Sequence, residues 1–485
     1  MSRRSNQNIH RKYGKRNDRV VSGYVTIACV LLKCIYVIKS HHIQLFRLFV
    51  AFLGGPSLGL SFAFAGTTYT AGPDTYLAKL KKLEPGAHVH LLPGEYKNGL
   101  PIKYLHGTAQ APITISGPEK ESRAVFVARP GHNTVSIINS SYITVRNLDL
   151  DGRNLPVNGV KCEGHADWAH HITLDGLRVR GHGHNQQTVG ISTKCPAWGW
   201  VIRNNIIDGA GTGLYLGNSD GRAPFIAGLI EHNLVIDTRG YNLQIKHQLA
   251  RSVLPGMPEG NNATIIRHNV FSKANGGSKD VARPNVLVGH WPLTGAGAND
   301  RYLIYGNFFY QNPYESLFQG EGNIALYNNL FVNYFGDAIR IQPHNETTRA
   351  ISVFYNTVIA KGSGIILVRR EDDPMYSQFV IANIVFAGSP VRGASYEKNL
   401  TGKFDEARKY FTRPFGPLGE MNLMPVVAKI QKHSENGMRF DIYPEADLDF
   451  DGDLRTGHNV GAFAINKIGS RWRPALEIKP IAAPQ

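Results

Sequence analysis

The side chains best suited to chemistry stand on short segments that recur along the chain. In TGLYLGNSDG, YNLQIKHQ, NVLVGHW, AIRIQPH and SGIILVRR, polar and apolar residues alternate, as in short β-strands. Alternate residues of a strand point to the same side. Alignment of the segments therefore gives two columns of outward residues. One column contains Tyr215, Gln244 and Arg340, and the other contains Lys246 and Gln342. His290 and Arg369 lie just beyond these columns. Such a row could bind an extended anionic polymer, and it could also be a solvated face with ordinary surface charges.

The elements that would position these side chains repeat. An Asn followed by apolar residues recurs at Asn147, Asn205, Asn233, Asn269, Asn307, Asn329, Asn356 and Asn383, with Gly176 in the slot after the first. With Gly176 included, the steps are 22 to 38 residues long, which suits the coils of a right-handed parallel β-helix with loops of unequal length. Stacked coils share one apolar core, and an Asn in the same turn of each coil can bond its neighbours above and below. The sequence predicts an all-β, single-stranded solenoid in which these Asn residues are structural.

Three parts follow from this pattern: a basic leader over residues 1–65, the β-helix over 66–395, and a C-terminal cap or extension over 396–485. A short amphipathic helix over residues 74–83 is expected to cap the first coil, which LEPGAHVHLLPGEY would form. Another helical stretch is expected near residues 404–410. The run from Asp447 to Asp453 follows half of a calcium-binding loop, but its twelfth position is His458 rather than Glu. We expect this run to be terminal structure.

Composition and charge narrow the class of protein. The 485 residues include 51 Gly and 26 Pro, which excludes a coiled coil or helical bundle. The chain has 53 Lys and Arg against 37 Asp and Glu, a net charge of +16, but the leader holds ten of these bases and one acid, so the rest carries +7. This moderate excess suits an acidic polymer, whereas nucleic acid binding is disfavoured by the small charge and by the leader. We expect a monomer.

The leader contains two apolar stretches, residues 20–38 and 45–65. The second ends in Ala63-Phe64-Ala65 and is typical of a secretory signal cleaved after Ala65. The first either lies upstream of the true start or is a marginal membrane span. We therefore expect a secreted or periplasmic protein, with stable membrane association only if the leader is retained. Cys162 and Cys195, which follow the leader, are free to pair but need not do so.

Longer motifs resemble a known family. LEPGAHVHLLPGEY followed by GTAQAPITISG, and LQIKHQ with IIRHNVF, are similar to polysaccharide lyase family six, the group of chondroitinase B and the alginate lyases. The resemblance covers residues 68–269, and the later coils by architecture only. It implies a pectate-lyase-like solenoid and a carbon–oxygen lyase that acts on an acidic polysaccharide.

The resemblance also implies site residues. In that family a Lys on one strand is the base, an Arg at the following turn assists it, and a His lies beside the Arg. Lys246, Arg267 and His268 stand at matching places, and Arg267 follows Lys246 by 21 positions. The family's calcium ligands include two carboxylates shortly before the Lys, where this sequence has Arg239 and Tyr241. A fixed guanidinium can neutralise a substrate carboxylate instead, so we predict no cofactor, with calcium as the alternative.

The chemistry would be β-elimination. Removal of the proton beside a uronate carboxylate creates charge that fixed cations must neutralise. We expect Arg267 and Arg239 to hold the carboxylate, Lys246 to take the C5 proton, and His268, Tyr241 or water to protonate the leaving sugar. Lys246 needs burial or neighbouring cations to lower its pKa. The structural alternatives are a solvated Lys246 and a His268 that only completes a turn.

Other functions stay open. A uronan C5-epimerase shares the proton abstraction and returns the proton from the opposite face. A glycoside hydrolase needs paired carboxylates, and no Asp-Asp pair stands between Asn147 and His182. A non-catalytic protein that binds acidic polysaccharide would use the basic row without needing Lys246, Arg267 and His268 in one spot.

Two further groups of residues have both a structural and a functional interpretation. Trp198 and Trp200 either stack on sugars or fill a loop. His165, Asp167, His170 and His171 are interpreted as a polar turn rather than a metal site, because their spacing fits no regular strand or helix face.

Overall fold

The computed structural model describes residues 66–120, 122–371, 376–393, 398–426, 440–456, 460–464 and 472–481. The predicted leader, with Cys29 and Cys34, lies outside the described residues, as does His458. Among the residues that are described, no helix is long and apolar enough to cross a membrane.

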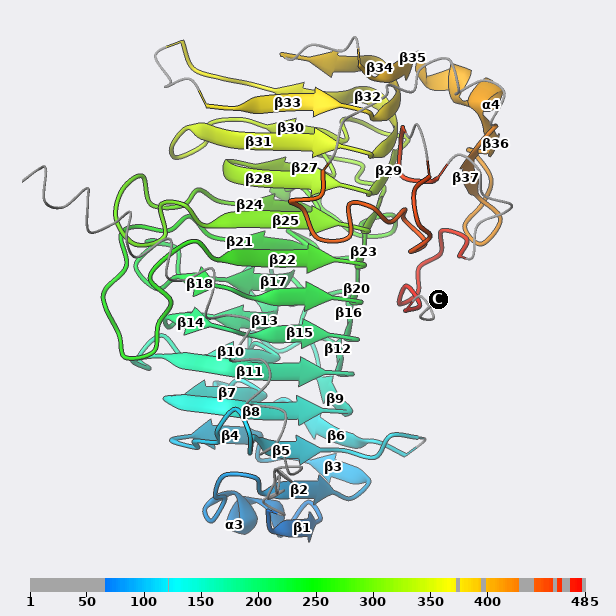
Figure 1. Ribbon diagram of the computed structural model, residues 1–485. Helices are drawn as coiled ribbons and strands as arrows, with labels where there is room; N and C mark the ends of the chain where they lie inside the picture. The colour runs from blue at the N-terminus through cyan, green and yellow to red at the C-terminus, as the bar shows by residue number, and fades with distance from the viewer. Residues whose placement is uncertain are drawn as a thin grey trace, which may run out of the picture. The chain divides into compact units, whose positions relative to one another are not determined.

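The chain coils through three ladders of parallel strands (Figure 1). The first ladder is a 14-stranded sheet. It runs through β1 (Thr68–Ala71), β2 (His88–Leu91), β5 (Ile113–Ser116), β8 (Ser140–Arg146), β11 (Ala169–Asp175), β15 (Val201–Arg203), β19 (Leu229–Glu231), β22 (Ala263–Arg267), β25 (Arg301–Tyr305), β28 (Gly322–Tyr327), β31 (Thr348–Phe354) and β33 (Gln378–Ile381), with β14 (Ala197–Trp198) and β18 (Phe225–Ile226) off this path.

The other two ladders form one 21-stranded sheet. The second ladder holds β3 (Gly94–Tyr96), β6 (Ala124–Val127), β9 (Leu148–Asp151), β12 (Arg178–Arg180), β16 (Ile206–Asp208), β20 (Leu234–Ile236), β23 (Val270–Ser272), β26 (Phe308–Tyr310) and β29 (Leu330–Asn333). The third holds β4 (Leu100–Lys103), β7 (Val135–Ile138), β10 (Val160–Cys162), β13 (Val189–Thr193), β17 (Thr212–Leu216), β21 (Leu243–Ile245), β24 (Val286–Val288), β27 (Phe318–Gly320) and β30 (Ile339–Ile341). The long strand β32 (Thr357–Leu367) joins the two ladders, since it pairs with both β29 and β30, and β34 (Ile384–Arg392) and β35 (Leu400–Gly402) follow.

Each coil visits the first, second and third ladder in turn, as β22, β23 and β24 do, so the fold is the predicted parallel β-helix. The predicted cap helix is α3 (Tyr76–Leu80), which buries Tyr76 and Leu80. The second predicted helical stretch consists of the 3-10 turn η3 (Phe404–Glu406) and α4 (Ala407–Tyr410). A further 3-10 turn, η2 (Lys279–Val281), lies in a loop, and β36 (Phe411–Arg413) pairs antiparallel with β37 (Asn422–Pro425). The second ladder continues through β32 and β34 to β35, beyond residue 395, where the sequence predicts the end of the β-helix.

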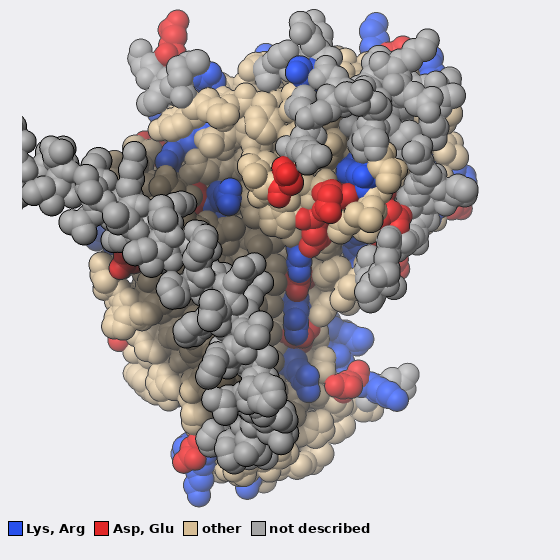
Figure 2. All heavy atoms as spheres, viewed as in Figure 1, with Lys and Arg blue, Asp and Glu red and all other residues tan. Residues whose placement is uncertain are grey.

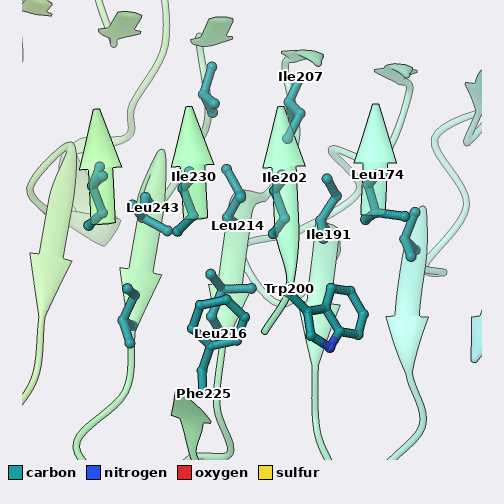
Figure 3. Packing of buried hydrophobic residues seen from close by; sticks show 14 of the residues in the cluster. Leu174, Ile191, Trp200, Ile202, Ile207, Leu214, Leu216, Phe225, Ile230 and Leu243 are labelled. Carbon is teal, nitrogen blue, oxygen red and sulfur yellow. The ribbon is translucent and has the colours of Figure 1, made fainter. Parts of the chain in front are cut away.

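Inward side chains of the three ladders meet in one continuous core. Figure 3 shows Leu174, Ile202 and Ile230 of the first ladder facing Ile191, Leu214 and Leu243 of the third, with Ile207 of the second beside them. Every one of these side chains is completely buried. Because strand residues alternate in direction, burial of this set fixes which residues of the third ladder face outward.

Asparagines stack in the turn between the first and second ladders. Nδ2 of Asn205 donates to Oδ1 of Asn233 over 2.9 Å, and the same bond repeats through Asn269, Asn307, Asn329, Asn356 and Asn383 to Asn399 at 2.9–3.0 Å. The predicted structural role is therefore confirmed for seven of the eight Asn residues. Asn147 is the exception: its φ is 57°, and Leu177, which follows Gly176, stands in the slot below Asn205 and donates its N–H to Oδ1 of Asn205.

Cys162 and Cys195 form a disulfide with Cα atoms 6.0 Å apart. It ties the end of β10 to the residue just beyond Lys194 on the next coil. The backbone of Lys194 also donates to Cys162 O over 3.1 Å. Lys194 is thus held at a fixed height on the third ladder.

Candidate functional site

Two outward columns run along the third ladder. Cross-strand register aligns one column through Lys161, Ser192, Tyr215, Gln244, Leu287, Gln319 and Arg340, here called the tyrosine column. The predicted alignment of Tyr215, Gln244 and Arg340 is therefore observed. Gln244 is 5% exposed and lines the floor of this face. Arg340 is partly exposed, and its Nη2 binds Asp337 Oδ2 at 2.7 Å, while Nη1 donates to Gln342 over 3.4 Å.

The second column lies two residues further along each strand and is called the lysine column. It contains Glu163, Lys194, Gly217, Lys246, Gly289, Glu321 and Gln342. Backbone bonds extend the ladder to this level: Lys246 N donates to Leu216 O over 2.8 Å, Gly289 N to Ile245 O over 2.9 Å, and Gln342 N to Gly320 O over 3.1 Å. Lys246 and Gln342 therefore share a column as predicted.

Glycines flank Lys246 on both neighbouring coils. A Cβ on Gly217, whose φ is 86°, would lie 3.4 Å from the Cβ of Lys246. A Cβ on Gly289 would lie 2.3 Å from His247 N, so no side chain fits there. Lys246 therefore has no side chain beside it in the lysine column on either neighbouring coil. The next side chains in the column are Lys194 on one side and Glu321 on the other, each two strands or about 9.6 Å away along the column. We call this part of the lysine column, from Lys194 to Glu321, the lysine bay.

Burial lowers the pKa of both amines at the bay, and neighbouring lysines lower that of Lys194 further. The Nζ atom of Lys194 lies 3.4 Å from the centroid of the Tyr215 ring. Burial, with Lys161 and Lys246 nearby, lowers the pKa of Lys194 to about 8. Burial also lowers the pKa of Lys246, against the opposing effect of Glu321. Burial raises the pKa of Tyr215, with a further rise from Tyr241, so its phenol keeps its proton near neutral pH. The bay thus holds a basic pair beside a proton donor.

Sequence reasoning did not single out Lys194. The segment STKCPAW lacks the motif that drew attention to LQIKHQ, because its aligned strand residue is Ser192 rather than a large polar group. The sequence does contain one indication of Lys194. It follows Ser192 by two residues, as Lys246 follows Gln244, and Ser192 and Gln244 belong to the same column.

The remaining predicted residues of this face have supporting positions. His290 is 4% exposed, its ring stacks on that of His247 at 5.3 Å, and its Nδ1 lies 2.9 Å from Trp291 O. It packs beside the bay rather than opening into it. Arg369 is exposed and follows β32 at the far end of the row.

Arg239 and Tyr241 precede β21, whereas Lys246 follows it, so the strand separates them. Arg239 is exposed and donates to His184 O over 3.4 Å. Tyr241 lies under the guanidinium of Arg283, which is 5.8 Å from the ring centroid. Calcium requires several oxygen ligands, mostly carboxylates and carbonyls, so two guanidinium groups and a protonated phenol do not fit a calcium ion here. The expected placement of Arg239 beside the Lys246 amine is not observed.

Arg267 and His268 lie on the first ladder, away from the bay. Arg267 closes a charge column of Arg146, Asp175, Arg203, Glu231 and Arg267, aligned through successive strands. Figure 2 shows this column as alternating blue and red atoms over the ends of β8, β11, β15, β19 and β22. Arg267 Nε donates to Glu231 over 2.8 Å and Nη1 to Glu445 over 2.5 Å. These bonds occupy the guanidinium.

His268 completes the same contact with the C-terminal segment. Its Nε2 lies 3.1 Å from Glu445 Oε2 and its Nδ1 lies 3.2 Å from Lys479 Nζ. Burial and Lys479 lower its pKa to about 3, so the ring is neutral. The structure therefore does not bring Arg267 and His268 to Lys246. The spacing of 21 residues misled because it runs through the loop after Lys246 and along β22, and the residue aligned with Lys246 on the next coil is Gly289.

Replacement of Arg267 by Ala distinguishes a structural role of this residue from a catalytic one. We expect a loss of about 2 kcal/mol of unfolding free energy, because Glu231 and Glu445 lose a charged partner in a partly buried site. The turnover rate should stay within about twofold, since Arg267 does not face the bay. Chemical denaturation and initial rates on one preparation test this. A variant of unchanged stability with turnover reduced more than a hundredfold would restore Arg267 to the catalytic site.

The chain matches no protein-family model and no curated protein sequence. It is similar to solved structures. An alginate lyase from Paenibacillus sp. strain FPU-7 is 17% identical, with 69% of this chain and 97% of that chain covered and a TM-score of 0.36. A mannuronic-acid-specific polysaccharide family 6 lyase from the human gut microbiota is 14% identical, with 69% and 87% covered and a TM-score of 0.39. Pectate lyase Pel9A is 10% identical, with 82% and 96% covered and a TM-score of 0.44. Glycoside hydrolases, such as a lacto-N-biosidase from Eubacterium ramulus, are also similar. At these identities the likeness is one of fold.

Proposed function

We propose that the protein is an exported lyase that cleaves a uronate-containing acidic polysaccharide by β-elimination at the lysine bay. The observation that carries this proposal is the arrangement of Lys194 and Lys246 on either side of Gly217, with the Tyr215 ring beneath Lys194. Two amines in one column supply what the reaction needs, which is a free base for the proton and a cation for the carboxylate.

The roles follow from the surroundings of each amine. Lys194 has a pKa of about 8 and therefore carries its proton at neutral pH. Lys194 stays charged against the face of the Tyr215 ring, which stabilises an ammonium group, and it neutralises the substrate carboxylate. Lys246, between Gly217 and Gly289, takes the C5 proton. The bond between C4 and the bridging oxygen breaks, a double bond forms between C4 and C5, and the Tyr215 hydroxyl gives its proton to the departing oxygen. Lys161, aligned with Ser192 in the tyrosine column, adds positive charge along this face.

The carboxylates of the lysine column do not support hydrolysis. Glu163 and Glu321 stand five strands apart, about 24 Å, whereas glycoside hydrolases place the two groups about 5–9.5 Å apart. Both are also occupied. Asn133 and Lys161 hold Glu163, and the backbone N–H groups of His344, Asn345 and Glu346 donate to Glu321 over 2.8–3.1 Å.

The test offers the mature chain from Gly66 a panel of alginate, polygalacturonate, dermatan sulfate and hyaluronan in the presence of EDTA. A rise in the ultraviolet absorbance of the unsaturated uronate on one polymer supports a lyase that needs no metal. Absence of a rise together with solvent deuterium incorporated at C5 would replace the lyase by an epimerase. Saturable binding with neither change would reduce the protein to a binding module.

The pH dependence of cleavage follows from the amine pair. The base works only without its proton, and burial lowers the pKa of Lys246, whereas Lys194 must keep its proton and has a pKa of about 8. We expect kcat/KM to rise about tenfold per pH unit below the lowered pKa of Lys246 and to fall once Lys194 loses its proton above about pH 8. Initial rates from pH 5 to 10 at constant ionic strength test this. A maximum near pH 5 followed by a fall would exclude an amine as the base.

A further inference from the structure

Aromatic rings gather where the third ladder turns into the first. His170 of β11 stacks on Trp198 of β14 with centroids 4.5 Å apart, and Trp168, in the loop before β11, lies 4.9 Å from His170. His171 stacks on Tyr142 of β8 at 4.4 Å, and His106 lies 5.7 Å from Trp168. We call Trp168, His170, His171, Tyr142 and His106, with Trp198 as their floor, the aromatic platform.

The platform is continuous with the lysine column along the chain. Lys194 ends the third ladder on its coil, and Trp198 follows four residues later on β14. One coil earlier, Glu163 ends the third ladder and Trp168 follows before β11. Because consecutive coils stack in register, the loop from Glu163 to Trp168 and the loop from Lys194 to Trp198 lie side by side and connect the lysine column to the platform. A polymer that enters the bay can pass over these rings.

The backbone holds the rings flat. Tyr142 and His171 occupy equivalent places on consecutive coils, with φ of 54° and 51°, and Gly199 occupies the next with φ of 65°. A Cβ on Gly199 would lie 2.9 Å from ring atoms of His171. The His171 ring therefore lies between the Tyr142 ring and the bare backbone of Gly199. Any side chain at residue 199 would push this ring away.

The platform is open to solvent and carries little charge. Trp168, Tyr142, His170 and His171 are partly exposed and His106 is exposed, whereas Trp198 is 1% exposed. Burial, with His171 and His106 nearby, lowers the pKa of His170 to about 4. Burial lowers the pKa of His171 as well. Both rings are neutral at pH 7, so they offer nitrogen atoms to hydroxyl groups and no cation to a carboxylate.

Trp198 and Trp200 belong to the interior. Trp200 is completely buried and donates its Nε1–H to Ala169 O over 3.0 Å. Both indoles fill the interior at the corner of their coil. Of the two alternatives given for Trp198 and Trp200, the structural one is therefore observed. The indole that reaches the surface is Trp168, which the sequence did not single out.

We propose that the aromatic platform is a sugar-binding subsite for the acidic polysaccharide, with Trp168 stacking on the apolar face of a pyranose ring next to the sugar held at the bay. An indole offers a large rigid face at low entropic cost, and the neutral imidazoles accept or donate hydrogen bonds at hydroxyl groups. The neutral rings of His170 and His171 offer no charge to a carboxylate, so this subsite binds the sugar by the shape of its ring. It makes the protein selective for extended chains over short fragments.

This inference rests on the proposed function for the identity of the polymer, and Trp168→Ala tests it. Phe335→Ala removes an aromatic side chain of 57% exposure beyond β29 and is the matched control. Hexasaccharides and trisaccharides of alginate, polygalacturonate and dermatan sulfate are titrated against the mature wild-type chain, each variant and Lys246→Ala, by calorimetry and indole fluorescence.

We expect the Kd of the preferred hexasaccharide to rise about five- to tenfold in Trp168→Ala, the trisaccharide Kd to change less than twofold, and Phe335→Ala to match the wild type. The Lys246→Ala variant should still quench Trp168 fluorescence with the hexasaccharide. This quench without any cleavage by the wild type would refute the lyase and keep the subsite. Cleavage with equal hexasaccharide Kd in Trp168→Ala and wild type would refute the subsite and keep the lyase. Absence of binding by every oligosaccharide would overturn both.

Discussion

Lys246→Ala is expected to lower kcat/KM on the preferred polymer about a thousandfold or more, while the protein folds as before. General base catalysis typically contributes about 10²–10⁴ in rate, and this change removes the group to which we assign that role. Folding should be preserved because Lys246 is partly exposed and its flanking positions are Gly217 and Gly289, so no packed side chain loses a neighbour. Initial rates from ultraviolet absorbance, together with a thermal unfolding curve, measure both effects.

Charge-conserving variants separate the base from its neighbour. Lys246→Arg keeps the charge, but a guanidinium stays protonated at any working pH, so this variant should be as inactive as Lys246→Ala. Lys194→Arg should keep a tenth or more of the activity, because the role assigned to Lys194 is that of a cation. Lys361→Ala, a charge loss at an exposed residue of β32, controls for the net charge and should be unaffected. Active Lys246→Arg with inactive Lys194→Arg would exchange the two roles, and full activity in all variants would remove the bay from the mechanism.

The fold could be predicted because its determinants are local and repeat. An inward apolar residue recurs on every strand, and the Asn slot marks where each coil turns, so the ladders follow from the chain one coil at a time. Asn147 was misplaced because a polar residue before an apolar pair also suits the left-handed turn position that Gly176 fills on the next coil. The local pattern is the same, and only the pairing of coils tells the two slots apart.

The candidate site could be predicted only in part, because loop lengths decide which residues share a level. Tyr215, Gln244 and Arg340 were aligned correctly, since each stands inside a strand. Arg267 was placed beside Lys246 from a sequence distance that ignores the loop of residues 246–262. Its partner Glu445 comes from the far end of the chain, and no local pattern around Arg267 announces that contact.

Asn307→Ala is expected to lower the free energy of unfolding by about 4 kcal/mol, the largest stability effect that we predict for a single side chain. Asn307 is completely buried, and its Nδ2 donates to Asn329 Oδ1 over 3.0 Å and to Ile266 O over 2.9 Å. Its Oδ1 accepts from both N and Nδ2 of Asn269 at 2.9–3.0 Å. Each buried polar group left without a partner costs about 1–3 kcal/mol, and the truncation strands at least two.

Asn147→Gly is the matched control for Asn307→Ala. Asn147 lies in the left-handed region with φ of 57°, which glycine adopts freely and Gly176 already adopts on the next coil. We expect a change below about 0.5 kcal/mol. Urea unfolding followed by circular dichroism compares the two variants with the wild type. Equal losses would mean that the whole turn, rather than the bonded Asn stack, stabilises the coils. A loss confined to Asn307→Ala would mean that each coil depends on the side-chain hydrogen bonds of the Asn stack. The same stack would then fix the spacing of the coils that carry Tyr215 and Lys246.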